Sequence, residues 1–277
     1  KFYDFQKFFK SRICKINITL EKYLRDLLSI YKISKLPIYT HSVVGIHQIS
    51  NFFKKKNCKV YFSADGADEL FGGYKIYEKI DWKSNNSNLS PYSSINQGVY
   101  KTIKIKDKKY KQNLNNFRNR VRKKYSFLNN KKDINIQSNL FCDYFIQAVK
   151  VGNACNDLVG SDNSVEIRNI FVQKSIIKEI INIPAKFKIN LENQNKFKLK
   201  IILKKLFAKY FDNKYIFEKQ GFSGFPNEVK NHSKIKFKYI KRLLGKRNFN
   251  KYKTKRDFEW KFINLELFKK QSYKQKN

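Results

Sequence analysis

Residues 60–74 read VYFSADGADELFGGY, and the fold that the sequence predicts depends on this stretch. The β-branched and aromatic residues of 59–63 predict a short buried strand that ends at Ser63. The chain then turns at Gly66, and a helix is expected directly after the turn. Three acids follow the strand: Asp65, Asp68 and Glu69. Acids three and four positions apart can share one helical face, so the pattern predicts an acidic surface at the end of a strand.

Two amphipathic segments precede this strand. Residues 19–30 carry leucines at helical spacing after a cap at Asn17 or Thr19. Residues 42–56 place apolar side chains on one helical face: Val43, Ile46, Ile49, Phe52 and Phe53. The order helix, strand, acidic turn, helix is typical of α/β proteins, so we predict an α/β fold.

Two interpretations of the acidic turn stay open on spacing alone. In open α/β sheets ligands bind just beyond the carboxyl ends of strands, and acids beside free helix N–H groups suit a Mg²⁺-bound polyphosphate. Alternatively, the acids only cap the helix, since negative charge is favoured at a helix N-terminus. A calcium loop of the EF-hand type is excluded, because Ala67 and Leu70 stand where that loop needs an oxygen ligand and a glycine.

The composition excludes several classes of protein. The 277 residues are 41% hydrophobic and 16% aromatic, which is enough for a core and excludes wholesale disorder. No apolar run reaches the roughly 20 residues of a membrane helix and no signal peptide opens the chain, so we expect a cytoplasmic protein without membrane contact. The cysteines lie far apart without a CxxC pair, which predicts reduced thiols: Cys14, Cys58, Cys142 and Cys155. The histidines are expected on the surface or in loops: His41, His47 and His232.

The formal net charge of +38 suggests a polyanionic partner at first sight. However, 51 of the 60 basic residues are Lys and 9 are Arg, whereas surfaces that grip phosphates or bases rely on Arg. The lysines also come with abundant Asn, Ile, Phe and Tyr, which share A/T-rich codons. We therefore attribute the charge to codon drift, with a nucleic-acid-binding surface as the alternative.

Three motifs resemble the synthetase domain of glutamine-dependent asparagine synthetases. Residues 63–74 (SADGADELFGGY) resemble the family signature S-G-[ED]-G-A-D-E-L-F-G-G-Y. Residues 164–171 (SVEIRNIF) resemble S-[LV]-E-x-R-x-P-F-L-D, and Asp157 stands nine residues before Glu166, as in D-R-x-x-M-x-x-S-x-E. Residues 218–222 (EKQGF) resemble R-K-Q-G-F. The motifs occur in the family's order and span most of the chain.

The resemblance implies a fold and a set of site residues. The fold implied is the adenine-nucleotide α-hydrolase (PP-loop ATPase) type, a parallel sheet with helices on both faces, incomplete at its N-terminal side and largely helical at its C-terminal side. Cofactor-binding residues implied are Ser63, Ala64, Gly66, Asp68 and Glu69. Asp65 and Lys219 would be catalytic, with Asp65 and Asp68 also holding Mg²⁺. Three residues are expected to be structural: Asp157, and the loop pair Glu166 and Arg168, which would anchor the fold by charge-assisted bonds.

The resemblance also implies an activity, asparagine synthesis from aspartate. ATP adenylylates the aspartate side-chain carboxylate, ammonia from glutamine attacks, and AMP and pyrophosphate leave. The implied cofactors are ATP and Mg²⁺, the partners are small molecules, and a homodimer would form through a glutaminase domain. The alternatives are an amidotransferase acting on another carboxylate, a basic nucleic-acid-binding protein, and a non-catalytic remnant.

The chain departs from the family pattern in several places. No S-G-G-x-D-S phosphate loop occurs in the 277 residues, Ala64 replaces a Gly, and residues 170–173 read IFVQ instead of P-F-L-D. The chain contains no Met and begins with Lys, so we expect a processed chain, an excised domain or a fragment that is inactive alone. Asp68 is expected to be an exposed acid whose replacement by Asn leaves the fold intact.

We divide the chain into four parts. Residues 1–82 are expected to form the truncated nucleotide-binding part, and 83–139 a variable Lys/Asn-rich insertion of exposed helices and loops. Residues 140–231 would be the helical remainder of the synthetase domain, and 232–277 a basic helical tail. Within the third part, we expect a loop followed by a helix over 164–183, and an amphipathic helix over 197–211.

Overall fold

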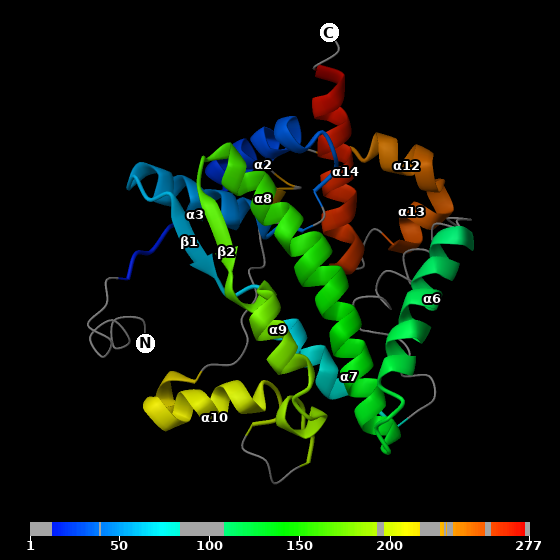
Figure 1. The fold of residues 1–277 in the computed structure, drawn as a ribbon. Coiled ribbons are helices and arrows are strands. Elements are labelled where there is room, and N and C mark those ends of the chain that lie inside the picture. The colour runs from blue at the N-terminus through cyan, green and yellow to red at the C-terminus, as the bar shows by residue number, and fades with distance from the viewer. Residues whose placement is uncertain are drawn as a thin grey trace.

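The computed structural model describes residues 13–38, 40–83, 108–192, 197–216, 228–229, 231, 235–252 and 256–274. This part of the chain is mostly helical and contains a two-stranded parallel sheet (Figure 1). The strands are β1 (Val60–Ser63) and β2 (Glu166–Asn169). The α-helices are α2 (Leu20–Ser34), α3 (Val43–Lys55), α4 (Ala67–Phe71), α6 (Lys108–Lys124), α7 (Lys131–Asp143), α8 (Asn153–Asp162), α9 (Lys174–Ile181), α10 (Ile201–Tyr210), α12 (Lys238–Leu244), α13 (Lys246–Tyr252) and α14 (Arg256–Lys274). Shorter elements are the 3-10 turns η1 (Lys75–Lys79), η3 (Ile170–Val172), η4 (Ala185–Phe187) and η5 (Asn213–Tyr215), and the π-helix η2 (Tyr144–Gly152).

The parallel sheet brings together two segments that lie about a hundred positions apart in the sequence. Val60 lies opposite Glu166, and Ser63 lies opposite Asn169. Strand β1 confirms the strand expected at 59–63, whereas β2 falls where we expected a loop, so that expectation was wrong. The four residues of β2 are too few to show a strand period, and pairing with β1 is what makes them a strand. The carboxyl ends of both strands therefore lie side by side.

Helices α3 and α8 cover one face of the sheet. The ring of Tyr61 stacks on Phe53 of α3, with the ring centroids 4.7 Å apart. The neighbouring residue on the same face, Ile167, packs against Gly160 of α8, where a Cβ atom would lie 3.2 Å from the Ile167 side chain. Small residues at such a point allow a helix to lie close to a sheet.

The opposite face of the sheet differs from the expected arrangement with helices on both sides. Phe62 on this face is 63% exposed, and the side chains of Glu166 and Arg168 are more than half exposed. Parallel sheets are ordinarily buried on both faces. In the described part of the chain, this sheet is covered on one face.

Helix α14 packs against α2 in the largest apolar cluster. Trp260 and Ile263 are buried against Tyr23 and its neighbours on α2. A polar contact joins the same elements, because the Tyr31 hydroxyl donates a hydrogen bond of 2.6 Å to Asn264 Oδ1. Helix α14 therefore contributes residues between 260 and 268 to the main core.

Helices α7, η2 and α8 form one continuous diagonal rod in Figure 1. This rod crosses the boundary between the expected insertion, 83–139, and the helical remainder that begins at 140. Ile136 and Leu140 on α7 are buried in an apolar cluster with Ile189. Residues 135–140 thus belong to the packed interior, while the division of the chain into four parts stays a prediction.

The expected helices are confirmed with small changes in their ends. Segment 19–30 forms α2, whose N-cap Thr19 accepts a hydrogen bond of 3.3 Å from the Lys22 backbone N–H. Segments 42–56 and 197–211 form α3 and α10. The expected apolar face of α3 is wrong in part, because Ile49 is 39% exposed. Polar side chains take the buried positions instead: His47, Gln48 and Ser50. In the described helices, none is both long and apolar enough to cross a membrane.

Candidate functional site

The candidate site lies at the carboxyl ends of β1 and β2. The chain leaves β1 at Ser63, whose hydroxyl accepts a hydrogen bond of 3.3 Å from the Asp65 backbone N–H. It then turns sharply at Gly66, where φ is +95°, a value that favours glycine. The short helix α4 begins at the next residue and carries Asp68 and Glu69 in its first turn. The strand, turn and helix expected from residues 60–74 are therefore present.

Asp65 is held by a cluster of side-chain amides, Asn153, Asn156 and Asn169, which we call the asparagine cluster. Asn156 Nδ2 donates to Asp65 Oδ2 at 2.8 Å and to Asn169 Oδ1 at 3.2 Å. Asn169 Nδ2 donates in turn to Asn153 Oδ1. The cluster joins the end of β2 to helix α8 and to the acidic turn. No motif in the sequence pointed to these asparagines.

Asp68 forms an ion pair with Lys200, the residue before α10, at 2.5 Å between Oδ1 and Nζ. The two side chains are 16% and 26% exposed, so Asp68 is not the exposed acid that we expected. Gly73 lies against this pair, because a Cβ atom there would overlap Asp68 Oδ1 and Lys200 Cε. Among 51 lysines, nothing in the local sequence distinguishes Lys200, and only the tertiary structure brings it to the acidic turn.

Glu69 points into the protein beneath the turn. It is 5% exposed and accepts a hydrogen bond of 2.5 Å from the Tyr74 hydroxyl. A second tyrosine–acid pair lies nearby, in which Tyr77 donates to the fully buried Asp143 at 2.8 Å. Burial, followed by the charge of Asp143, raises the pKa of Tyr77 well above its ordinary value. These contacts give Glu69 a supporting place in the site.

Two buried polar atoms at the turn have no hydrogen-bond partner in the part of the chain that the structure describes, Tyr144 Oη and Asn156 Oδ1. Tyr144 is 3% exposed and lies directly under Gly66, where a Cβ atom would come 3.4 Å from its ring. Burial and the charge of Glu69 raise the pKa of Tyr144 to about 12. A buried polar atom without a partner costs stability, and both of these atoms lie at the turn.

The acids of the turn do not form a metal cage made by protein alone. No group of three or more His, Cys, Asp or Glu side chains that could hold a metal occurs among the described residues. Mg²⁺ is commonly bound through one or two carboxylates, with substrate phosphates completing its ligands. Asp65 and Asp68 fit that second kind of site, in which the protein supplies only part of the coordination.

Some of the expected site residues that the structure describes are exposed. Lys219 lies outside the described residues. Ala64 is exposed in the turn, and Asp157 is exposed on α8. Glu166 and Arg168 lie on β2 and not in a loop, and they bond to each other at 2.9 and 3.1 Å on the exposed sheet face. The Arg168 guanidinium lowers the pKa of Glu166, and the expectation that the pair anchors the fold stays a prediction.

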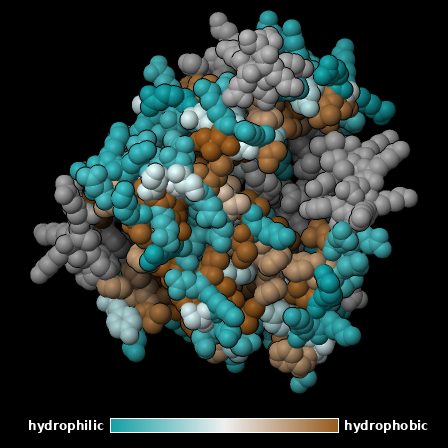
Figure 2. Space-filling model, turned by 45° about the horizontal axis from the view of Figure 1, so that its top comes forward, coloured by the Kyte–Doolittle hydropathy of each residue, from teal (hydrophilic) through white to brown (hydrophobic). Residues whose placement is uncertain are grey.

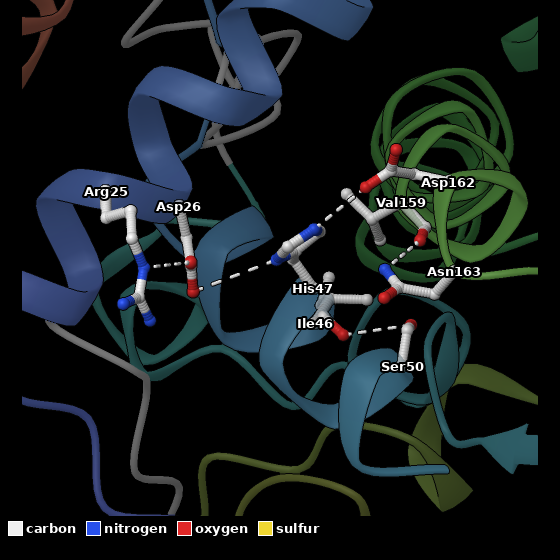
Figure 3. Close-up of polar contacts among 8 residues, drawn as sticks. All are labelled: Arg25, Asp26, Ile46, His47, Ser50, Val159, Asp162 and Asn163. Carbon is white, nitrogen blue, oxygen red and sulfur yellow. Dashed lines mark hydrogen bonds and ion pairs between the residues drawn. The ribbon is translucent and has the colours of Figure 1, made fainter. Parts of the chain in front are cut away.

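His47 is buried, and the expectation of a surface or loop histidine was wrong for this residue. Its Nε2 lies 3.0 Å from Asp162 Oδ2 of α8, and its Nδ1 lies 3.8 Å from Asp26 Oδ2 of α2 (Figure 3). Asp26 and Asp162 raise the pKa of His47 against the effect of burial. The histidine thus connects three helices behind the sheet. His41 is half-buried, and His232 lies outside the described residues.

A mostly helical α/β domain with an acidic turn at the carboxyl ends of parallel strands has the architecture of a ligand-binding α/β protein. The family model of asparagine synthase matches residues 6–258. The chain belongs to the asparagine synthase family and is therefore of the ATP-dependent amide ligase kind. No curated protein matches the chain.

Proposed function

We propose that this chain carries the nucleotide-dependent half of an amide-forming reaction at the carboxyl ends of β1 and β2. The concentration of negative charge at this place carries the proposal. The chain has 22 acidic and 60 basic residues, yet three acids lie within residues 65–69. A local negative charge in a strongly basic protein attracts a divalent cation, and that cation in turn neutralises a bound polyphosphate.

In the proposed reaction a carboxylate oxygen of the substrate attacks the α-phosphorus of ATP, and pyrophosphate leaves. The product is an acyl-adenylate. Ammonia derived from glutamine then attacks the acyl carbon, and AMP leaves as the amide forms. The resemblance of residues 63–74 and 218–222 to the family motifs supports the aspartate side chain as the substrate carboxylate.

Several described residues at the turn have a proposed role. Asp65 and Asp68 would hold Mg²⁺, which supplies neutralising charge to the phosphates when bound. Lys200 lies beside Asp68 and would stabilise the negative charge on the departing pyrophosphate. Lys219 keeps the catalytic role that the resemblance implies for it. Ser63 and the backbone at Gly66 lie next to these groups and would line the phosphate position.

A second candidate is an amidotransferase of the same family that acts on another carboxylate. The observation that favours it is the departure from the family pattern, because Ala64 replaces a Gly and residues 170–173 read IFVQ instead of P-F-L-D. A nucleic-acid-binding function receives less support. Figure 2 shows hydrophilic residues spread over the drawn face, with hydrophobic patches between them, and not gathered in one area.

Binding of Mg·ATP by titration calorimetry at low ionic strength tests the proposal. We expect wild-type residues 1–277 to bind, and Asp68→Asn to weaken binding at least tenfold, because one carboxylate ligand is lost (on the order of 1.5–3 kcal/mol for a charged contact). The matched control is Asp212→Asn, which breaks another Asp–Lys pair, 3.2 Å from Lys214, far from the turn in sequence. Circular dichroism checks the fold, since Asp68→Asn also removes the partner of Lys200. Equal binding by both variants would contradict the proposed site.

Two further assays separate the alternatives. Pyrophosphate exchange with a panel of carboxylates identifies the substrate class wherever turnover occurs. Filter binding to nucleic acid over a salt series tests the nucleic-acid-binding alternative. The slope of log affinity against log salt concentration follows the number of phosphate contacts. Tight, salt-sensitive binding of nucleic acid without Mg·ATP binding would replace the ligase proposal.

A further inference from the structure

We propose that Asn156 is a positioning residue for Asp65, which it orients at the carboxyl ends of the sheet without adding a positive charge. The inference rests on the proposed function, because it assigns this acid to the nucleotide site. It is carried by the geometry of the asparagine cluster, which neither the family match nor the motifs predict.

The donor side of Asn156 is fully used. A side-chain amide has two N–H donors, and Asn156 Nδ2 lies 2.8 Å from Asp65 Oδ2 and 3.2 Å from Asn169 Oδ1. The opposite orientation of the amide would place an oxygen against these two acceptors, so its direction is fixed by its neighbours. Asn169 is itself oriented by the bond to Asn153. Asn156 therefore offers Asp65 a donor from a side chain that cannot turn.

Burial makes this arrangement rigid. Asn156 is 1% exposed, on a helix that is continuous with α7 and η2 and packs against α3 and β2. A hydrogen bond from an amide to a carboxylate is charge-assisted and stronger than one between neutral groups. A carboxylate held from a packed helix is preorganised for a ligand, because its rotamer is set before the ligand arrives.

The two aspartates of the turn, Asp65 and Asp68, have side-chain partners of different charge. Asp68 is paired with the cation of Lys200, whereas Asp65 accepts its side-chain bond from a neutral amide. The Asn156 contact orients Asp65 but adds no positive charge. Asp65 therefore remains the more available negative charge for a divalent cation or an ammonium group at the site.

The acceptor side of Asn156 supplies a second observation. Its Oδ1 is buried and has no hydrogen-bond partner within the described segments. An asparagine that served only to fill the interior would satisfy both ends of its amide, since a buried unpaired carbonyl costs stability. The unsatisfied oxygen lies on the same amide that holds Asp65, so the donor side of Asn156 alone orients this amide.

A double-mutant cycle tests the inference with two measurements on the full chain. The variants are Asn156→Ala, Asp65→Asn and the double variant, and the measurements are urea unfolding without ligand and calorimetric binding of Mg·ATP. We expect Asn156→Ala to weaken Mg·ATP binding about tenfold, the loss of one charge-assisted contact. In the Asp65→Asn background the same substitution should change the affinity by less than about twofold, because its effect passes through Asp65.

The control variant is Asn163→Ala on the same helix. Asn163 is 3% exposed and its Nδ2 donates to Val159 O at 2.8 Å, away from any acid of the turn. We expect Asn163→Ala to lower stability as Asn156→Ala does, but to leave the Mg·ATP affinity unchanged. Should Asn156→Ala fail to fold, Asn156→Ser serves in its place, because the serine hydroxyl is too short to reach Asp65.

Each remaining outcome decides the question. Unchanged affinity in Asn156→Ala, or an equal loss in the Asp65→Asn background, would overturn the positioning role. Absence of coupling in urea unfolding would overturn the contact itself. If the wild-type chain binds no Mg·ATP while unfolding still shows coupling, the proposed function fails and the inference fails with it, but the asparagine cluster stands as a structural feature.

Discussion

At the scale of single residues, the lysines of this chain are not equivalent. Lys188 is 2% exposed, and its Nζ donates a hydrogen bond of 2.8 Å to Gln137 Oε1. Gln137 in turn donates to Ile183 O at 2.6 Å. Burial lowers the pKa of Lys188 to about 7, because the charged amine has lost most of its hydration. One lysine of the interior therefore titrates near neutrality while the chain as a whole carries a large positive charge.

Lys188 should make the protein more stable as the pH rises. Between pH 7 and about 10.4 the unfolded state binds the Lys188 proton and the folded state does not, so the free energy of unfolding increases with pH. Relative to Lys188→Met, we expect the wild-type protein to gain about 1.4 kcal/mol per pH unit from pH 7 to 10. Urea unfolding across this range measures the difference.

The control for this prediction is Lys186→Met in the same turn, since Lys186 is exposed. This variant should follow the pH dependence of the wild type. Parallel curves for wild type and Lys188→Met would mean that the Lys188 amine stays charged in the folded protein.

At the scale of elements, three helices meet around His47. Asp26 belongs to α2, His47 to α3 and Asp162 to α8 (Figure 3). Arg25 also faces this group, with its Nε 3.7 Å from the other oxygen of Asp26. A protonated imidazole can donate to both aspartates at once, whereas a neutral one can donate to one of them. Because α8 also carries Asn156, this junction sets where the asparagine cluster lies relative to the sheet.

The junction should weaken as the pH rises through the folded-state pKa of His47. That pKa is raised, so the stabilisation is complete below the unfolded value of about 6.5 and is lost above the folded value. Nuclear magnetic resonance can follow the titration directly, because the chain has only three histidines. We expect the titration midpoint of His47 to lie above that of histidine in a model peptide. In His47→Gln, the free energy of unfolding should change less between pH 6 and 8 than it does in the wild type.

His41→Gln provides the comparison for this second pH effect. His41 lies in the loop before α3, with its ring 5.8 Å from that of Trp260. We expect this variant to keep the wild-type shape of the curve. A titration midpoint of His47 at or below pH 6.5 would contradict this prediction. It would show that burial lowers the pKa of His47 by more than the two aspartates raise it.

At the scale of the whole molecule, the residues that we propose for the phosphate site all come from one side of it. The acidic turn, Lys200 and the asparagine cluster lie on one side, at the ends of β1 and β2. The S-G-G-x-D-S loop, which cradles phosphate with backbone amides in the family that the chain resembles, is absent from the 277 residues. Each preorganised donor of this kind is typically worth about 10²–10³ in rate.

We therefore expect residues 1–277 to bind Mg·ATP weakly and to show no pyrophosphate exchange above a blank without enzyme. The assay contains ATP, Mg²⁺ and aspartate. Exchange well above the blank that is lost on Lys219→Ala would contradict this expectation and show that another element supplies the phosphate contacts. The same exchange persisting in Lys219→Ala would point to a contaminating enzyme.

The sequence by itself determined the local elements and the family of this protein. Helical spacing and the Thr19 cap predict α2, and residues 60–74 specify the strand, the turn at Gly66 and the acids behind it. These features depend on neighbours within a few positions, where the side-chain pattern and the backbone preference of glycine act directly. The motif spacing identified the asparagine synthase family for the same reason, because motifs are local strings.

Only the tertiary structure decided which distant side chains meet these elements. Strand β2 exists because residues 166–169 pair with β1, and its four residues carry no period of their own. Lys200 reaches Asp68, and Asn156 reaches Asp65, across 132 and 91 positions of sequence. His47 is buried between two aspartates on other helices, and one of them, Asp162, lies within hydrogen-bond distance of its ring. In each case a polar or charged group is stabilised by a partner that packing brings to it, and no pattern within a single segment encodes that partner.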